Sequence, residues 1–161
     1  MEKFSNFKIE KFKLIKEDIE ALVDLVPIEE PNTLIKSEPA KFVSKLFESR
    51  EMAHIYHLQI KGDGSYAAHK ALDEYYSGIL DLIDSLIEIY QGQYDIIENY
   101  DIIDTSNTNN IDKIEYFTNL AQFIKDTRYT AILKEDTHLQ NIIDEIVALI
   151  YHTLYKLKML K

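Results

Sequence analysis

Hydrophobic residues recur at helical spacing along four long segments of the chain. From residue 38 to 62, apolar side chains fall near one helix face, namely Phe42, Val43, Leu46, Phe47, Met52 and Ile55. From 65 to 92, steps of three and four residues separate Leu72, Tyr76, Ile79, Ile83, Leu86 and Tyr90. This spacing is typical of helices that bury one stripe. Two further helices are predicted over 111–133 and 137–159.

Residues that start or stop helices mark the ends of these segments. Ser37 is a suitable N-terminal cap, with Pro39 near the first turn of the helix that follows. Gly92 is a natural stop for the second helix. Asp136 or Thr137 can cap the last helix, and lysines near its end suit the negative end of the helix dipole.

The connection between the second and third predicted helices is long. It contains two similar stretches, 95–98 and 101–104, with the sequences Asp-Ile-Ile-Glu and Asp-Ile-Ile-Asp. We expect a short extra helix within 94–104, followed by a polar loop over 105–110. Four long helices with one long crossover predict an all-α, ferritin-like antiparallel four-helix bundle instead of a simple up-and-down bundle.

The first 36 residues are expected to form an extension ahead of a bundle domain that spans 37–161. Apolar and charged positions alternate over 7–15 until Leu14-Ile15 breaks the pattern, which favours an extended arm that packs on a neighbour. A short helix is expected from about 16 to 26. Pro27 and Pro31 then indicate a turn before the bundle.

Composition narrows the chemistry that the chain can perform. The chain has 161 residues, of which 46% are hydrophobic, enough for one sizeable core, and its four glycines and three prolines are few for a β-rich fold. The absence of cysteine leaves only His, Asp and Glu as metal ligands. No stretch approaches the ~20 apolar residues of a membrane span, and the N-terminus has no apolar signal core. We therefore expect a cytoplasmic protein without a membrane partner.

Charge is unevenly distributed along the chain. The formal net charge is −10, but residues 1–16 contain five lysines and two glutamates, a net of +3, so the remainder carries −13. An acidic body repels nucleic acid, and we expect no strong DNA binding. The basic arm could contact nucleic acid or an acidic partner, although lysines in such positions are usually only solvated.

One arc of the second helix carries potential metal ligands. At 100° per residue, His69, Asp73, Asp84 and Glu88 lie at about 0°, 40°, 60° and 100° on the helical wheel. The apolar stripe centres near about 300°, so this arc borders the expected core. Carboxylates that are buried must be paired, hydrogen-bonded or bound to a cation, and a metal ion is the simplest partner here.

The length of the helix prevents one chain from completing a metal site. Asp73 and Asp84 are separated by roughly 16 Å along the axis, at about 1.5 Å per residue. If two such helices cross antiparallel about a two-fold axis, the 69/73 end of one lies beside the 84/88 end of the other. Two equivalent sites per dimer then result. The centre of the crossing falls beside Gly78, where a missing side chain permits close approach.

Residues 54–92 resemble the signature segment of the Dps family, the miniature ferritins. In that family a histidine ends the first helix, and a second histidine follows twelve residues later. An acid then stands four residues on, another after eleven more, and a glutamate after a further four. The matching residues in this sequence are His57, His69, Asp73, Asp84 and Glu88, and the Lys61-Gly62 turn is in register.

This resemblance implies an inter-subunit ferroxidase site. His57, His69 and Asp73 would bind iron together with Asp84 and Glu88 of the neighbour, and the iron would be oxidised there. Imidazole with hard carboxylate oxygens suits Fe(II), and zinc or manganese can occupy the same ligand set. The resemblance further implies iron storage or detoxification, protection against oxidative stress, and a dodecameric shell of two-fold dimers.

The sequence departs from the Dps pattern beside the ligands. Leu58 stands where the family usually has Trp, and Glu88 lies between Ile87 and Ile89 without the usual basic partner. Three tyrosines could replace the missing indole, although a core role is commoner for such residues; they are Tyr56, Tyr66 and Tyr76.

The remaining histidines are not expected to bind the metal directly, and a second function is also possible. His54 is expected to be a hydrogen-bonded neighbour of the ligands, with an outer-sphere role as the alternative. His138 and His152 are interpreted as structural. The alternative function is that of a ferritin-fold assembly or interaction protein whose metal site is structural or vestigial.

Overall fold

The computed structural model describes residues 31–160, and all regular structure in that part of the chain is helical. The elements are α2 (Pro31–Gln59), α3 (Ser65–Gln93), the 3-10 turn η1 (Ser106–Asn109), α4 (Lys113–Ala131) and α5 (Thr137–Met159). The all-α four-helix prediction is therefore confirmed. The predicted extension over 1–36 lies almost entirely outside the described residues, as do its arm and its short helix.

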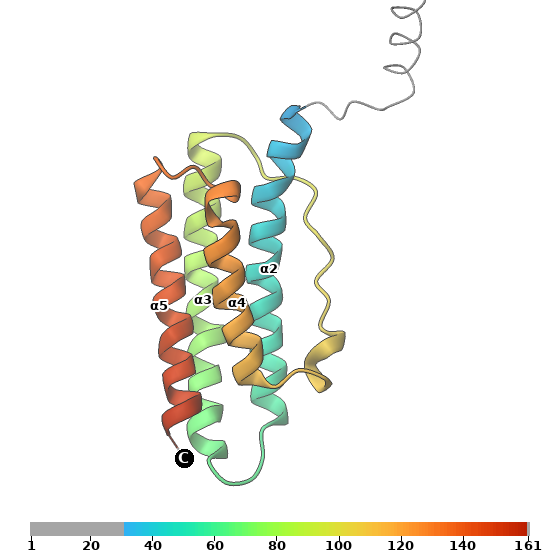
Figure 1. The fold of residues 1–161 in the computed structure, drawn as a ribbon, viewed down its shortest axis with the longest axis vertical. Coiled ribbons are helices and arrows are strands. Elements are labelled where there is room, and N and C mark those ends of the chain that lie inside the picture. The colour runs from blue at the N-terminus through green and yellow to red at the C-terminus, as the bar shows by residue number, and fades with distance from the viewer. Residues whose placement is uncertain (1–30, 161) are drawn as a thin grey trace, which may run out of the picture. The chain divides into compact units, whose positions relative to one another are not determined.

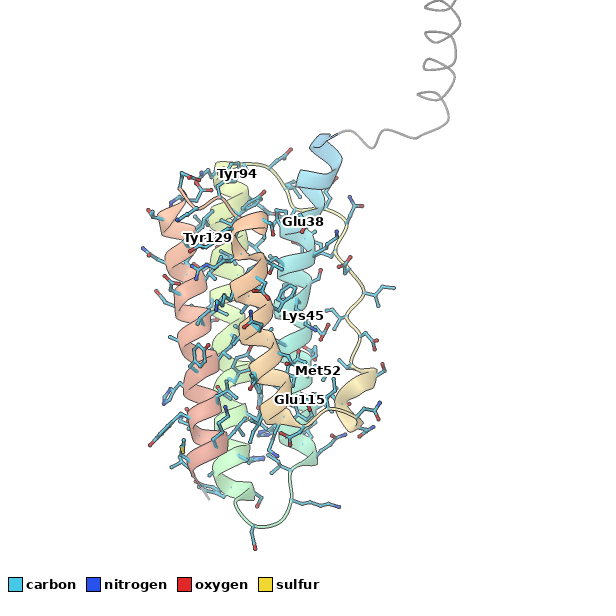
Figure 2. All side chains as sticks on the ribbon, viewed as in Figure 1. Glu38, Lys45, Met52, Tyr94, Glu115 and Tyr129 are labelled. Carbon is cyan, nitrogen blue, oxygen red and sulfur yellow. The ribbon has the colours of Figure 1, made fainter. Side chains whose placement is uncertain are left out.

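The long crossover determines how the four helices run. Figure 1 shows α2 and α3 as an antiparallel hairpin, after which the chain returns along the length of the bundle before α4 begins. In Figure 2, Glu38 near the start of α2 lies at the same end of the bundle as Tyr94 and Tyr129, and Glu115 lies toward the other end. As a result α3 and α4 run in the same direction, and α5 runs opposite to both.

The hydrophobic core fills the space between the helices. Its residues on α3 differ at one position from the apolar stripe predicted for that helix. Tyr75 is fully buried, whereas the predicted Tyr76 is only partly buried at the edge of the core. The Tyr75 ring packs against Phe117 of α4 with 4.7 Å between centroids, and its hydroxyl lies 2.8 Å from Ser49 Oγ of α2. Burial of this hydroxyl is tolerated because it has a hydrogen-bond partner. Other core residues of α3 match the prediction: Leu72, Ile79, Ile83 and Leu86.

The start of α2 differs from the predicted start at Ser37. The helix begins at Pro31, so Ser37 is not a cap and Pro39 lies inside the helix. Proline is favourable at the first position of a helix because its missing N–H has no intrahelical partner there. Pro31 therefore begins the helix that it was expected to precede.

The short helix predicted within 94–104 is wrong. Residues 94–105, all of which the structure describes, form no helix, and η1 lies instead in the predicted polar loop. Side chains satisfy the amide groups of this segment: Ile97 N–H donates to Gln91 at 3.0 Å, and Asp101 N–H donates to Ser44 at 2.9 Å. Such side-chain acceptors compete with the carbonyls that a helix would use.

The last two helices begin at aspartates that act differently. Asp112 caps α4 by accepting a 2.8 Å hydrogen bond from Ile114 N–H. Asp136 precedes α5 without a capping bond from its side chain in the described structure, and accepts bonds from Gln93 and Tyr94 instead. It therefore links the end of α3 to the start of α5. None of the helices that the structure describes has the length and apolar character needed to cross a membrane.

Candidate metal centre

A glycine-containing turn brings the two predicted histidine ligands together. Gly62 and Gly64 have φ angles of 90° and 72°, in the left-handed region that glycine adopts without strain. The turn closes through Ser65 N–H, which donates to the Gly62 carbonyl at 3.1 Å. His57 in the last turn of α2 consequently faces His69 near the start of α3.

The two imidazole rings are stacked and hydrogen-bonded to each other's backbone. Their centroids lie 3.7 Å apart with an interplanar angle of 26°. Nδ1 of His57 lies 3.0 Å from the carbonyl oxygen of His69, and Nδ1 of His69 lies 3.3 Å from the carbonyl oxygen of His57. A carbonyl can only accept, so each Nδ1 carries a proton, and Nε2 is the ring nitrogen that remains for a metal ion.

Asp73 lies one turn beyond His69 and already has two hydrogen-bond partners. Its carboxylate accepts from Lys70 Nζ at 3.0 Å and from the Tyr76 hydroxyl at 2.8 Å. The bond from Lys70 first, and then the bond from Tyr76, lower the pKa of Asp73 below its ordinary value. The group is therefore an anion at neutral pH, and a cation that binds it must compete with Lys70.

Tyr76 belongs to this site, although the sequence pattern assigned it to the buried stripe. Its ring lies 5.2 Å from that of His57, nearly perpendicular to it, and 4.5 Å from the ring of His54. The hydrogen bond to Asp73 raises the pKa of the Tyr76 hydroxyl, which stays a donor. A signal was present, because Tyr76 lies at about 340° on the wheel, beside His69 at 0°.

The structure does not bring Asp84 and Glu88 to the other predicted ligands within one chain. Both side chains are exposed on α3, a helix that continues without interruption between Asp73 and Glu88. Within the described residues of one chain, no three or more His, Asp or Glu side chains form a group able to hold a metal ion. The ligand set therefore remains divided between two ends of the helix.

The exposure of the predicted ligands weakens the argument, made from the helical wheel, that they are buried. His57 and Asp73 are half-buried, while His69, Asp84 and Glu88 are exposed. These carboxylates therefore incur no large desolvation cost in a single chain, contrary to the expectation from the wheel. A second copy packed on this face would bury them.

Gly78 does not face open solvent. A Cβ atom on this residue would lie 3.7 Å from Leu149 Cδ2 of α5, an ordinary van der Waals contact. The small residue therefore lies against the neighbouring helix of its own chain. Its proposed role in a close crossing with a second copy has no support from this packing.

Comparison with known proteins gives one result. Residues 57–157 match the model of a family described as "Family of unknown function (DUF5856)". Searches of curated proteins and of solved structures gave no match. The matched segment begins at His57 and includes all five predicted ligands.

Proposed function

Because the chain belongs to the DUF5856 family, whose function is unknown, we propose its activity from the chemistry of its own residues. The chain is a Dps-like protein that takes Fe(II) as its substrate at a site shared by two copies and oxidises it there. One copy contributes His57, His69 and Asp73, and the other contributes Asp84 and Glu88. Each Fe(II) loses one electron to dioxygen or to hydrogen peroxide.

The tautomeric state of the histidine pair carries this proposal. Hydrogen bonds from both Nδ1 atoms to main-chain carbonyls leave the two Nε2 atoms as the ring nitrogens available to a metal ion. A carboxylate whose pKa is lowered lies one turn away. Imidazole and carboxylate donors suit Fe(II), and zinc or manganese can replace the iron. Among the described residues of one chain these three side chains do not form a group able to hold a metal ion, so the stacked rings would have to turn for both Nε2 atoms to reach one ion.

A second copy is the natural source of the missing ligands. Asp84 and Glu88 are exposed, and an antiparallel two-fold pairing of α3 would place them beside the 69/73 end of the partner. Helix α3 carries five acidic residues and only one basic residue between 65 and 93. Two such faces repel each other, and bound cations at the two shared sites would remove that repulsion.

The Dps resemblance supplies the parts of the proposal that the residues cannot. These parts are the oxidation itself, storage or detoxification of the iron, and a dodecameric shell. A bundle whose crossover returns along its whole length is compatible with a ferritin-like arrangement. The acidic body would favour the entry of cations into such a shell.

One observation favours the alternative of an assembly or interaction protein. Asp73 is already neutralised by Lys70, an ammonium group 3.0 Å away that needs no metal ion. A chain with a vestigial site would retain this ion pair and would still dimerise through the same face. The two readings differ in whether the dimer takes up and oxidises Fe(II).

Complementation between two inactive variants tests the shared site. One variant carries Asp84→Ala and Glu88→Ala, and the other carries His69→Ala and Asp73→Ala. Each alone should lose Fe(II) oxidation. After both are unfolded and refolded together, half of the dimers are mixed and each mixed dimer has one intact site, so about a quarter of wild-type activity should return.

The control for this experiment is each variant refolded separately, with its helicity and its dimerisation measured in parallel. Recovery only in the mixture supports a site made from two chains. If the mixture stays inactive while both variants dimerise, the shared-site model is wrong. If wild-type protein neither takes up nor oxidises Fe(II), the interaction reading is the better one.

A further inference from the structure

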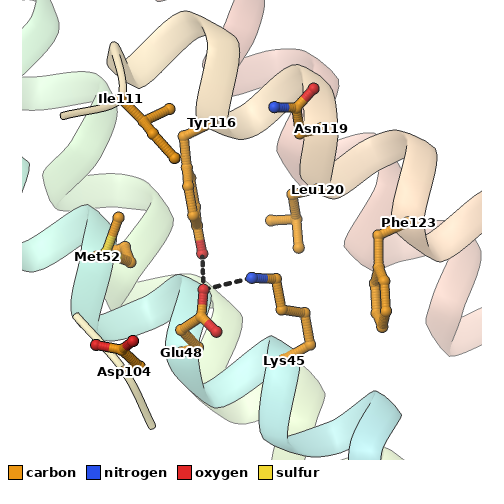
Figure 3. A pocket seen from close by; sticks show the side chains of 9 residues that line it. All are labelled: Lys45, Glu48, Met52, Asp104, Ile111, Tyr116, Asn119, Leu120 and Phe123. Carbon is orange, nitrogen blue, oxygen red and sulfur yellow. Dashed lines mark hydrogen bonds and ion pairs between the residues drawn. The ribbon is translucent and has the colours of Figure 1, made fainter. Parts of the chain in front are cut away.

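A groove lies between α4 and α5, and its volume is about 480 Å³. Tyr151, Tyr155 and Met159 are among the α5 residues that line it, and all three side chains are more than half exposed. In the cavity between α2 and α4, by contrast, Lys45 and Glu48 already form an ion pair with each other (Figure 3). Large apolar side chains gathered on one exposed face are typical of an interaction surface.

The exposed face of α5 has the residue spacing of a helix that pairs with another helix. Asp144, Ala148, Tyr151, Tyr155 and Lys158 are separated by four, three, four and three residues, and all five are exposed. At 100° per residue they fall within an arc of about 80° on the helical wheel. Contact residues alternate in this way where two helices pack side by side in a coiled coil. We call these five residues the α5 seam.

The α5 seam has opposite charges at its two ends. Asp144 lies seven residues before Tyr151 and Lys158 lies seven residues after it, roughly 10 Å along the axis in each direction. Asp144 accepts a 2.7 Å hydrogen bond from Arg128 on one oxygen, yet 63% of its side chain is exposed. Lys158 forms no ion pair within the described part of the chain. Each end can therefore pair with an opposite charge from outside the chain.

We propose that the α5 seam binds the same seam of a second copy, antiparallel and about a two-fold axis that passes beside Tyr151. Such an axis exchanges positions that are equally far from Tyr151, so Lys158 of each copy lies beside Asp144 of the other. Tyr155 of one copy packs over Ala148 of the other, where a short side chain leaves space for the ring. A parallel pairing would instead bring the two lysines together and the two aspartates together.

This contact is separate from the proposed metal centre. The predicted metal ligands lie on α2 and α3, whereas the seam lies on α5, so one copy can take part in both pairings. The α5 contact needs no metal ion and does not rest on the proposed function. An interface made mainly by one helix from each copy is small, and we expect a dissociation constant in the micromolar range.

Disulfide formation between copies tests the position of the axis, because the chain contains no cysteine of its own. Tyr151→Cys places the thiols of the two copies beside the axis, where they can form a bond. Tyr155→Cys is the matched control. Its two thiols lie four residues from the axis on opposite sides, about 12 Å apart, whereas a disulfide allows roughly 7 Å between Cα atoms.

The full-length variants are oxidised in the presence of a chelator, and covalent dimers are measured on a non-reducing gel. Tyr151→Cys should cross-link at least about tenfold faster than Tyr155→Cys, because only its thiols are within disulfide reach. Equal rates in the two variants, or no cross-link in Tyr151→Cys, would overturn the proposal.

Charge reversal tests the same contact without removing an apolar side chain. Sedimentation of the full-length protein with chelator, at about 0.15 M salt, measures the association. Lys158→Glu should weaken it at least about tenfold, because each introduced carboxylate faces Asp144 of the other copy. Asp144→Lys should weaken it similarly. An equal mixture of the two variants should associate as the wild type does, since a mixed dimer has opposite charges at both ends.

Lys134→Glu is the control for net charge, because Lys134 is exposed between α4 and α5 and lies outside the seam. This variant should associate as the wild type does. Equal weakening by Lys134→Glu and Lys158→Glu would show general charge repulsion and would contradict the proposal. Wild-type protein that stays monomeric at about 100 µM would contradict it too. So would a mixture of the two seam variants that does not associate while both remain helical by circular dichroism.

Discussion

The rings of His57 and His69 are stacked with 3.7 Å between their centroids, and each ring is hydrogen-bonded to the main chain of the other residue. The orientation of each imidazole is therefore set by the helix that carries its partner. Loss of either ring removes one predicted ligand and takes a stacking partner from the other ring. The hairpin, and not either helix alone, is the unit that presents the imidazoles.

His57→Ala should weaken Zn(II) binding by the dimer more than about 100-fold, the upper end of the effect of losing an outer-sphere partner. Zinc is the probe because its binding is measured by calorimetry without oxidation. His152→Ala on α5 is the matched control and should leave the affinity unchanged. Equal losses in the two variants would contradict the assignment of His57 as a ligand.

Tyr76→Phe keeps the ring beside His54 and His57 but removes the hydrogen bond to Asp73. We expect metal affinity to fall about tenfold, because an orienting partner of a ligand carboxylate is lost. Tyr66→Phe is the control, since Tyr66 is 78% exposed on the same helix. An unchanged affinity in Tyr76→Phe would show that Lys70 alone orients Asp73.

Tyr75→Phe tests the buried hydrogen bond between α3 and α2. The hydroxyl lies 2.8 Å from Ser49 Oγ, and Ser49 keeps a second bond to the Leu46 carbonyl. The free energy of unfolding should fall by about 1 kcal/mol, as measured by urea denaturation. A loss of about 4 kcal/mol or more would mean that the ring itself had moved, because that is the cost of deleting a large core side chain.

Asp136→Asn should remove part of the acid sensitivity of the fold. Bonds from Tyr94 first, and from Gln93, lower the pKa of Asp136 in the folded protein, so the folded state binds fewer protons than the unfolded state. The resulting stability is present above the unfolded pKa of about 3.9 and is lost as the pH falls through the lower folded value. Unfolding curves of wild type and variant should therefore differ most above the unfolded pKa and converge once the pH has fallen below the lower folded pKa. A constant difference across this range would exclude the linkage.

DNA binding should be weak at about 0.15 M salt, because phosphate contacts need basic residues and residues 17–161 carry a net charge of −13. A gel-shift assay with random-sequence duplex checks this expectation. Tight complexes that disappear when residues 1–16 are deleted would assign a function to the basic arm.

The ends of the helices were predictable where local chemistry permits one outcome. The last helix was predicted over 137–159, and α5 has these bounds. The third helix was predicted over 111–133, and the observed α4 is shorter than this at both ends. Asp112 caps its start, and Ile132 already has an extended backbone. The conformation of the crossover was harder to predict, because Asp-Ile-Ile sequences are compatible with a helix and also with a non-helical chain whose amides donate hydrogen bonds to side chains.

The candidate site was predictable only in part. The Dps resemblance, and not helical periodicity, predicted that His57 lies with His69, and the structure stacks their two rings. Tyr75 and Tyr76 are adjacent and chemically identical, and the position of Tyr76 beside His69 on the helical wheel was the one signal that its ring lies near the predicted ligands. The partner for Asp84 and Glu88 lies outside a single chain, and no pattern within one helix can supply it.

The crossover has a consequence for slow motions of the protein. Its residues 94–105 form no regular secondary structure, and side chains of Ser44 and Gln91 accept hydrogen bonds from two of its amides. In hydrogen–deuterium exchange the amides of Ile97 and Asp101 should be its slowest, and all of it should exchange before the core of α3. The segment can therefore open while the four helices stay folded. Proteolytic cleavage there would leave two helical hairpins that still associate through a common core.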